Sequence, residues 1–342
     1  MMPGENCFWN YLQGCYISKE NFAKWLFNVS MTINMQNMSN TTSSNIVLSP
    51  LDRTKVLCIS SAYFFQVAKN VFNKVQNGQE NRLFPVARTQ AFMDKIHCST
   101  LKASSTDKTD IHIILHDQRT RMNKEMGYSI KSRLGGSSTL INSAADSTNF
   151  VFSLGKVSED LTKEFNSLDR FKKKFDLLAE NSVSPKWIGV GSRTFYNNLM
   201  MIDTCLPWII GECMLYYYSG KAHTLVEAEA LLRKDNPLNF DIKSQPGFYE
   251  YKLKQFLLAF ALGMTAAKPW NGKFIANGGY IVVKEDGEIV CYHFFDRNEL
   301  EDYLFNNTYF DTPSTNRHNF GDIYSSENGD LLKLNLQVRF LS

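Results

Sequence analysis

The sequence predicts an α+β fold in which a small mixed β-sheet is flanked by helices. Three observations favour this class. Apolar residues recur at helical spacing over stretches such as Lys55–Val75. A compact apolar run within Thr109–Asp117 is followed by alternating residues over Gly127–Leu134, as expected of two neighbouring strands. Near the C-terminus, residues 279–284 and 288–295 flank the turn Glu285-Asp-Gly287 and predict a β-hairpin.

The composition is that of a soluble globular protein, with 44% hydrophobic and 21% charged residues. A net charge of +3 permits a nucleic-acid partner without requiring one. The seven cysteines are odd in number and contain no C-x-x-C pair, which favours a reducing, cytoplasmic location over a zinc module or a secreted disulfide framework. The N-terminus lacks a signal-peptide pattern. The most apolar stretches, Cys205–Tyr218 and Phe256–Ala267, are shorter than the roughly 20 residues of a membrane span, so no membrane association is expected.

The chain is expected to divide into three regions, with one continuous domain as the alternative. Residues 1–98 form a mainly helical N-terminal region, residues 99–186 a catalytic core, and residues 187–342 a helical and hairpin region that completes this core. In the first region, Ser18-Lys-Glu-Asn21 is expected to open a helix, and Val86–His97 to form another. The Asn- and Ser-rich stretch Met35–Ser49 is expected to be a loop.

The elements of the other two regions follow from the same periodicity rules. Besides the strands already given, we expect a strand at Phe150–Leu154 and a final strand at Leu331–Phe340. Helices are expected at Glu159–Glu180, Leu199–Tyr218, Thr224–Lys234 and Tyr249–Ala266.

Asp110 and Lys131 are the candidate catalytic pair. Asp110 lies at the start of an apolar strand and Lys131 lies within the next predicted strand, so sheet pairing brings them close together. A carboxylate can hold a divalent cation, and an ammonium beside it can offset charge on a phosphate undergoing hydrolysis. The alternative is an ordinary carboxylate and a solvated lysine with a snorkelling stem.

Two ordered blocks of sequence resemble the HpaII-type restriction endonucleases. The first runs from Lys102-Ala-Ser-Ser-Thr through Asp110-Ile-His-Ile, Gly127-Tyr-Ser-Ile-Lys131-Ser-Arg-Leu-Gly135 and Ser137-Ser-Thr-Leu-Ile-Asn142 to Thr148-Asn149-Phe150. The second contains Lys268-Pro-Trp-Asn-Gly, Gly278-Gly-Tyr-Ile-Val-Val, Asp311-Thr-Pro-Ser-Thr-Asn-Arg317-His318 and the tail Lys333-Leu-Asn-Leu-Gln-Val-Arg-Phe340. Each motif is weak alone, and their common order makes the resemblance much stronger.

The resemblance implies a nuclease core of the PD-(D/E)xK type, with a small mixed central sheet and a requirement for Mg²⁺. It assigns metal binding to Asp110 and the motif lysine to Lys131. The sequence departs from the motif at Thr109, where proline is usual, and at Ser129, where an acidic residue is usual. Ser129 therefore joins the catalytic candidates as a poor substitute for a carboxylate. Glu125 has the same strand parity as Ser129 and Lys131 if that strand begins early, which makes it a candidate metal ligand. The other candidates for the missing carboxylate are Asp107 and Asp117.

The resemblance also implies double-stranded DNA as the partner. Arg119, Arg121 and Arg133 lie beside the proposed centre and are candidates for gripping phosphates, or are simply a solvated basic surface. The segment Asn316-Arg317-His318 lies in what is expected to be a polar loop after Pro313. Its Arg and Asn are the residue types that bond guanine and adenine edges. The alternative is a capped loop packed beneath the last strand.

The recognition sequence cannot be derived from the residues, although the family name suggests CCGG. A cognate DNA methyltransferase would act on the same site without needing to bind this chain. A palindromic target favours a homodimer. The rival functions are a non-specific DNA nuclease and a nuclease-fold protein that binds DNA without cutting. An unrelated enzyme of a common class is disfavoured, because the sequence has no P-loop, G-x-G-x-x-G, G-x-S-x-G or H-E-x-x-H motif.

Overall fold

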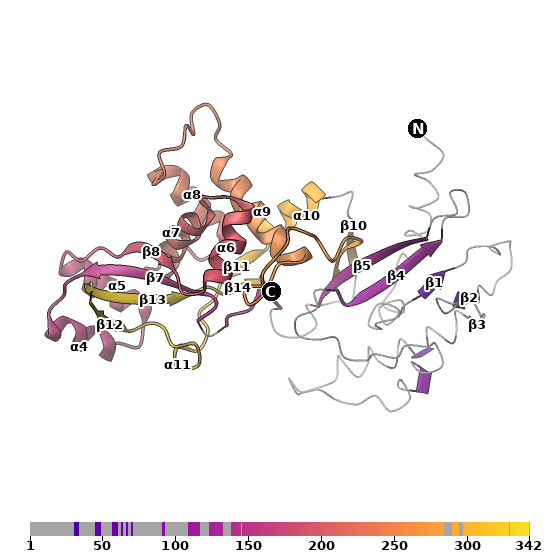
Figure 1. The fold of residues 1–342 in the computed structure, drawn as a ribbon, viewed down its shortest axis with the longest axis horizontal. Coiled ribbons are helices and arrows are strands. Elements are labelled where there is room, and N and C mark those ends of the chain that lie inside the picture. Colours follow the sequence, from indigo (N-terminus) through magenta and orange to yellow (C-terminus); the bar gives the residue numbers. More distant parts are fainter. Residues whose placement is uncertain are drawn as a thin grey trace. The chain divides into compact units, whose positions relative to one another are not determined.

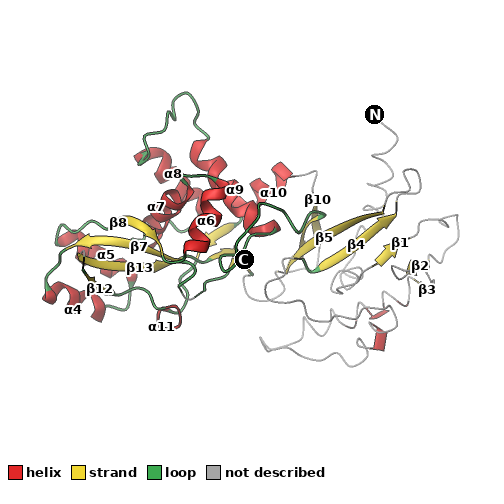
Figure 2. Ribbon diagram, in the orientation of Figure 1, coloured by secondary structure: helices red, strands yellow, loops and turns green. Residues whose placement is uncertain are grey.

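The computed structural model describes most of the chain beyond residue 108 and short pieces before it. The described residues are 31–33, 45–48, 57–60, 63, 66–67, 70, 91–92, 109–116, 123–132, 138–144, 146–283, 289–293, 297–327 and 329–341. The chain divides into two compact units. The first comprises residues 1–136 and 275–296, and the second comprises residues 137–274 and 297–342. Figure 2 shows the described helices and strands of both.

The first unit contains a mixed sheet of five strands in the order β1-β4-β5-β9-β10 (Figure 1). Its strands are β1 (Met31–Ile33), β4 (Ile111–His116), β5 (Asn123–Ser132), β9 (Gly279–Val283) and β10 (Ile289–His293). β4 and β5 are antiparallel, β5 and β9 are parallel, and β9 and β10 form the antiparallel pair expected of the hairpin. Because β9 lies directly beside β5, the segment that starts at Gly278 adjoins the segment that carries Lys131.

Two expectations for the N-terminal region were wrong. The predicted loop contains β2 (Asn45–Leu48), and the predicted helix from Lys55 begins instead with β3 (Leu57–Ser60), which pairs with β2 in antiparallel fashion. The physical reason is the β-branched and apolar character of Ile-Val-Leu in β2, which suits cross-strand packing. Tyr63 further along the predicted helix is helical, and so is Phe92 in the helix predicted at Val86–His97. The helix predicted to open at Ser18 lies outside the described residues.

The second unit is built on an antiparallel four-stranded sheet in the order β12-β13-β7-β8. The strands are β12 (Ile323–Ser326), β13 (Gly329–Asn335), β7 (Asn149–Gly155) and β8 (Lys186–Val190). Phe150 and Phe152 alternate with less buried residues along β7, as a sheet with one face against the core requires. A second sheet of three strands has the order β11-β14-β6 and consists of β11 (Thr308–Phe310), β14 (Val338–Phe340) and β6 (Thr139–Ile141).

Helices cover these sheets in the second unit (Figures 1 and 2). They are α4 (Glu159–Ser167), α5 (Phe171–Glu180), α6 (Arg193–Ile202), α7 (Leu206–Tyr218), α8 (Leu225–Asp235), α9 (Phe248–Leu262), α10 (Arg297–Asn306) and α11 (Thr315–His318). The core lies around α7 and α9, whose residues Ile209, Ile210, Phe256 and Leu257 are completely buried. The coarse prediction of an α+β fold is therefore confirmed for the residues that the structure describes.

Three predicted elements are interrupted. The helix expected at Leu199–Tyr218 is α6 followed by α7, bent by 107° at the break between them. The Asp203 carboxylate accepts a hydrogen bond of 2.8 Å from the Cys205 amide there, and Pro207 suits the first turn of a new helix. The helix expected at Glu159–Glu180 is likewise α4 followed by α5. The last predicted strand is divided between β13 and β14, which belong to different sheets.

No single helix among the described residues has the length and apolar character needed to cross a membrane. Helices α6 and α7 reach the length and apolar composition of a membrane span only when they are counted together, despite the bend between them. Most of α7 is buried inside the second unit, which accounts for its apolar composition.

Replacing Thr224 with alanine should lower the free energy of unfolding by about 1 kcal/mol. The Thr224 hydroxyl accepts from the Glu227 amide at 3.2 Å, and the Glu227 carboxylate accepts from the Thr224 amide, which completes a capping box at the start of α8. The matched control is Thr224→Ser, which keeps the hydroxyl. Urea denaturation of both variants measures the effect, and equal midpoints would show that this cap contributes nothing.

Candidate active site

The Asp110 carboxylate is fixed against the backbone of β5. Its Oδ2 accepts a hydrogen bond of 2.7 Å from the Ile130 amide and one of 3.5 Å from the Ser129 hydroxyl. The Asp110 amide donates to the Tyr128 carbonyl at 2.8 Å. The backbone and the side chain of Asp110 are therefore both tied to the strand that carries Lys131. Asp110 is nevertheless exposed, so its carboxylate is accessible to a ligand.

Lys131 follows the residue whose amide holds Asp110, and its side chain is half-buried. Burial lowers the pKa of the Lys131 ammonium, and the nearby negative charge of Asp110 acts in the opposite direction. Lys131 therefore differs from a freely solvated lysine: its charged end loses water and lies in the field of one carboxylate. A desolvated cation interacts more strongly with a bound anion than a surface lysine does.

Ser129 is buried, with 3% of its surface exposed, and its hydroxyl is directed at Asp110. The backbone beside it is closely packed. A Cβ at Gly127 would lie 2.6 Å from the Thr109 methyl carbon and 2.8 Å from the Ile275 carbonyl oxygen, so only glycine fits without movement. The Gly127 amide donates to the Asn277 side chain at 2.8 Å. Sequence reasoning did not single out Asn277. Its position directly before Gly278, in the second block of resemblance, was the available signal.

Asp110 and Ser129 bring one carboxylate and one hydroxyl together beside β5. β5 begins at Asn123, so it includes Glu125 at the position paired with Ile114, as the parity argument for Glu125 requires. Asp107 and Asp117 lie outside the described residues. Within the described ranges, no three His, Cys, Asp or Glu side chains cluster as a metal site. Magnesium commonly binds proteins through one or two carboxylates and keeps several waters, so an exposed and fixed Asp110 fits that mode.

The predicted DNA-contacting residues fall into two groups. Arg119, Arg121 and Arg133 lie outside the described residues. The second group is Asn316, Arg317 and His318 of the second unit. They lie on a single helical turn, α11, where a loop was expected. The expectation of a loop was wrong because the Ser314 hydroxyl caps the Arg317 amide at 3.4 Å and so starts α11. Asn316 and Arg317 are exposed, whereas His318 is buried.

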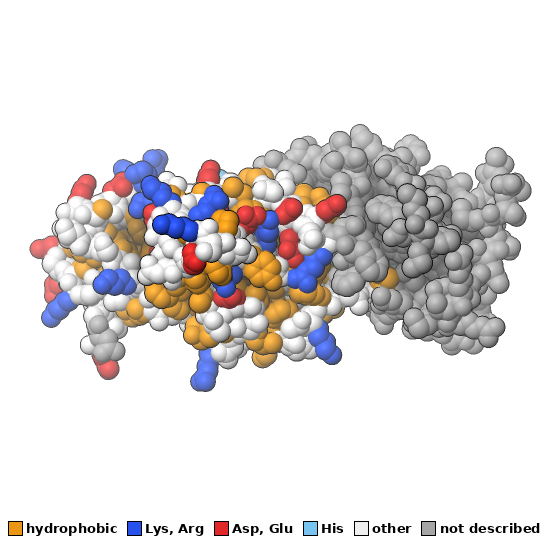
Figure 3. All heavy atoms as spheres, turned by 90° about the horizontal axis from the view of Figure 1, so that it is seen from above, with side chains coloured by type: hydrophobic (Ala, Val, Ile, Leu, Met, Phe, Trp, Pro, Cys, Tyr) orange, Lys and Arg blue, Asp and Glu red, His pale blue; other side chains and the backbone are white. Residues whose placement is uncertain are grey.

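Basic and acidic side chains are interspersed over the face of the second unit drawn in Figure 3. This mixture agrees with the small net charge of +3. Neither sign of charge therefore dominates the drawn face.

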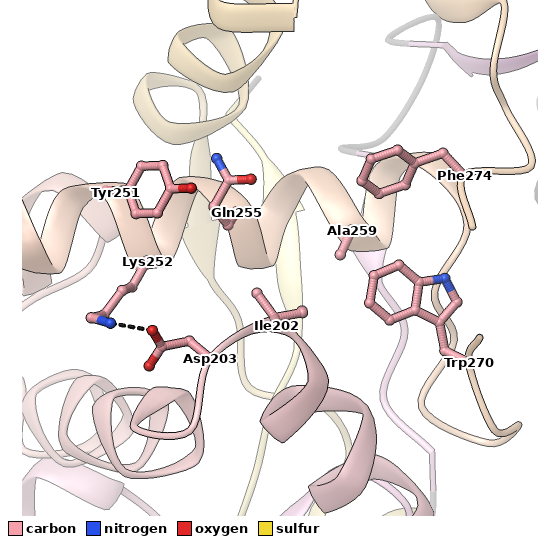
Figure 4. Close-up of a pocket in the computed structure, with 8 residues that line it drawn as sticks. All are labelled: Ile202, Asp203, Tyr251, Lys252, Gln255, Ala259, Trp270 and Phe274. Carbon is pink, nitrogen blue, oxygen red and sulfur yellow. Dashed lines mark hydrogen bonds and ion pairs between the residues drawn. The ribbon is translucent and has the colours of Figure 1, made fainter. Parts of the chain in front are cut away.

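A hollow of about 170 Å³ lies between α6, α9 and the segment around Trp270 in the second unit (Figure 4). Its polar groups already bind one another or their neighbours. Lys252 forms an ion pair with Asp203, Arg297 donates to the Gln255 side chain, and the Trp270 indole donates to the Lys273 carbonyl at 3.0 Å. None of the predicted site residues that the structure describes lines this hollow, and most polar groups of its described lining already have partners.

Comparison with known proteins matches this chain to one family. Residues 24–340 match the profile of the HpaII restriction endonuclease family. The chain is 40% identical over 299 residues to the type II restriction enzyme HpaII of Haemophilus parainfluenzae, a match that covers 87% of this chain and 83% of that enzyme. The comparison with solved structures found no match.

Proposed function

Because this chain belongs to the HpaII restriction endonuclease family, we propose that it hydrolyses double-stranded DNA at a short specific sequence, with Asp110 and Lys131 at the catalytic centre. The observation that carries this assignment is the hydrogen bond of 2.7 Å from the Ile130 amide to the Asp110 carboxylate. This bond fixes the Asp110 carboxylate beside Ile130, the residue directly before Lys131. The five-stranded mixed sheet beneath them is our candidate for a core of the PD-(D/E)xK type.

Each residue of the centre has a role that follows from its surroundings. Asp110 would hold Mg²⁺, and its bond to the Ile130 amide fixes the orientation of the carboxylate. When bound there, magnesium supplies Lewis acidity to the scissile phosphate and lowers the pKa of a coordinated water. The Lys131 ammonium offsets the charge that develops on the phosphate, and its partial burial strengthens that interaction. Glu125 stays the candidate for a second carboxylate, although it lies four residues before Ser129 on β5, which is about 13 Å along the strand.

Ser129 has a supporting role in this proposal. Its buried hydroxyl donates to Asp110, so it helps to orient the carboxylate instead of replacing an acidic ligand. A neutral hydroxyl is a weaker ligand for magnesium than a carboxylate. We therefore assign the Ser129 hydroxyl to the hydrogen bond with Asp110 and not to the metal.

Candidate residues for DNA contact occur in each of the two units. Arg119, Arg121 and Arg133 neutralise phosphates, and the exposed pair Asn316 and Arg317 reads base edges from α11. The first target to test is CCGG. The enzyme would act in the cytoplasm, as a homodimer on a palindromic site, where a cognate methyltransferase protects the host DNA.

Incubation with unmethylated plasmid and MgCl₂ should produce discrete fragments whose ends share one short sequence. Chelation of the metal with EDTA should stop cleavage, because the proposed centre has too little positive charge of its own to activate water. Sequencing of the fragment ends identifies the target. A smear would indicate a non-specific nuclease. Intact plasmid with a retarded gel band would indicate a protein that binds without cutting, the alternative raised by Ser129.

A further inference from the structure

A network of polar side chains, most of them buried, surrounds His318 of α11 in the second unit. It joins segments that are far apart in the sequence: the loop before β7, the start of β7, the end of β13 with the residues that follow it, and α11 itself. We call it the α11 platform and define it as Ser143, Thr148, Asn149, His318, Asn335 and Gln337. The proposed chemistry at Asp110 and Lys131 uses none of these residues.

One half of the platform is an asparagine pair between neighbouring strands. Asn335 of β13 lies opposite Asn149 of β7, and its side-chain Nδ2 donates to the side-chain Oδ1 of Asn149 at 2.6 Å. The Thr148 hydroxyl donates to the side-chain Oδ1 of Asn335 at 3.1 Å. The side-chain Nδ2 of Asn149 then donates to the backbone carbonyl of His318 at 3.2 Å. Thr148, Asn149 and Asn335 are each at most 1% exposed, so these bonds are shielded from water.

The other half of the platform reaches the His318 ring. The His318 Nε2 lies 3.2 Å from the Ser143 hydroxyl, and the Gln337 amide donates to that hydroxyl at 3.4 Å. Burial lowers the pKa of His318, and the neighbouring positive charge of Arg317 lowers it further. The Ser143 hydroxyl thus accepts from Gln337 and is bonded to Nε2 of the neutral ring, whereas Nδ1 is buried without a hydrogen-bond partner among the described residues. The His318 backbone and side chain are thus held by different members of the platform.

The chain on both sides of α11 is also anchored. Phe320 stacks on Phe171 with ring centroids 5.9 Å apart, and its ring also lies 6.2 Å from Tyr218. The buried Lys174 ammonium donates to the Gly321 carbonyl at 2.6 Å. At the other end, Ser314 caps the helix. A helix of one turn has little stability of its own, so these contacts and the platform determine its orientation.

We propose that the α11 platform orients Asn316 and Arg317 for base reading, with His318 as a positioning residue that determines sequence discrimination. The proposal rests on the proposed function, in which α11 contacts DNA. Asn316 and Arg317 are exposed on the single turn of α11. The next residue of that turn, His318, is buried and hydrogen-bonded to Ser143 and Asn149. Base discrimination needs donors fixed within a fraction of an ångström. The hydrogen bonds that hold His318 favour such fixation because each bond is directional. Apolar packing at the same place would hold the turn with less definite geometry.

The test compares His318→Asn with His318→Gln in the full-length chain. Glutamine can place its amide near the position of Nε2 and keep the bond to Ser143, whereas asparagine is too short to reach it. Each protein is incubated with a pool of DNA duplexes whose centre is randomised, and sequencing of the cut and uncut molecules gives a relative kcat/KM for every sequence. We expect H318N to reduce the preference for the cognate sequence over single-base variants by about tenfold, and H318Q to retain most of it.

Two further variants make the result decisive. Tyr216→Phe removes a bond of 2.8 Å from a buried tyrosine to Asp235, elsewhere in the same unit, and serves as the control for general destabilisation. Arg317→Ala tests whether α11 reads bases at all. Loss of discrimination in H318N and R317A, with Y216F unchanged and H318Q close to wild type, supports the proposal. Loss in R317A without loss in H318N overturns the platform's role but leaves the proposed function standing. An unchanged preference in R317A overturns base reading by Arg317, and with it the premise. An equal loss of sequence preference in H318N and Y216F overturns the proposal, because the platform would then contribute only to the general stability of the unit.

Discussion

Replacing Asp110 with asparagine should reduce the rate of DNA cleavage by about a thousandfold or more. Asparagine retains an oxygen that can accept from the Ile130 amide, so the local backbone is preserved. It removes the negative charge that holds a divalent cation. A thousandfold loss corresponds to about 4 kcal/mol of transition-state stabilisation, too much for the loss of one neutral hydrogen bond. Single-turnover cleavage of a duplex that contains the mapped target measures the effect.

The matched control for Asp110→Asn is Ser129→Ala. It removes the longer of the two bonds to the carboxylate, at 3.5 Å, and leaves the Ile130 amide and the charge of Asp110 in place. We expect a loss of about tenfold or less, because a marginal neutral hydrogen bond contributes about 1 kcal/mol. Specific binding by both variants, measured by gel retardation, should stay near wild type. A cleavage rate in D110N within tenfold of wild type would remove Asp110 from the catalytic centre.

The pairing of β4 with β5, which brings Asp110 close to the strand of Lys131, could be predicted from the sequence because local patterns determine it. The apolar run of β4 and the alternation of β5 are strong strand signals, and their short separation favours an antiparallel pair. The family resemblance led us to expect Ser129 at a position where the motif usually has an acidic residue. It did not indicate that the Ser129 hydroxyl would bond to Asp110, because that depends on the register between the two strands.

Other features could not be predicted because they depend on tertiary contacts. The short runs that form β2 and β3 have no clear period, and their pairing with each other decides their structure. His318 was grouped with Asn316 and Arg317 from their adjacency along the chain. One helical turn places them differently, with His318 inside and the other two outside. The sequence cannot reveal the partners of His318, which come from segments far before and after it.

The α11 platform also gives a physical reason for the two ordered blocks of resemblance. Thr148 and Asn149 end the first block, and His318 and Asn335 belong to the second. The structure joins them by hydrogen bonds in one buried network. A change at one of these positions would leave a buried polar partner unsatisfied, at a cost of about 1–3 kcal/mol. The residues that carry the resemblance in these places therefore constrain one another.

Replacing Lys131 with methionine should reduce cleavage about a thousandfold without destabilising the protein. Methionine keeps most of the apolar stem and removes the charge. Because burial lowers the pKa of Lys131, the folded protein bears a cost for holding this ammonium away from water at neutral pH. Removing the charge removes that cost, although it also removes an attraction to Asp110. The midpoint of urea denaturation should therefore stay near wild type or rise, while kcat falls and KM changes little.

Lys131→Arg separates the need for positive charge from the need for a compact ammonium. Arginine retains the charge, but its planar guanidinium is larger and does not fit the half-buried position beside Asp110 in the same way. We expect K131R to recover no more than about a tenth of wild-type activity. A strong loss in both variants, with unchanged folding and specific binding, would identify a group that acts on the reacting phosphate. A fall in stability that matches the fall in activity would instead make Lys131 a structural member of the sheet. Cleavage activity near wild type in K131M would exclude Lys131 from the chemistry altogether.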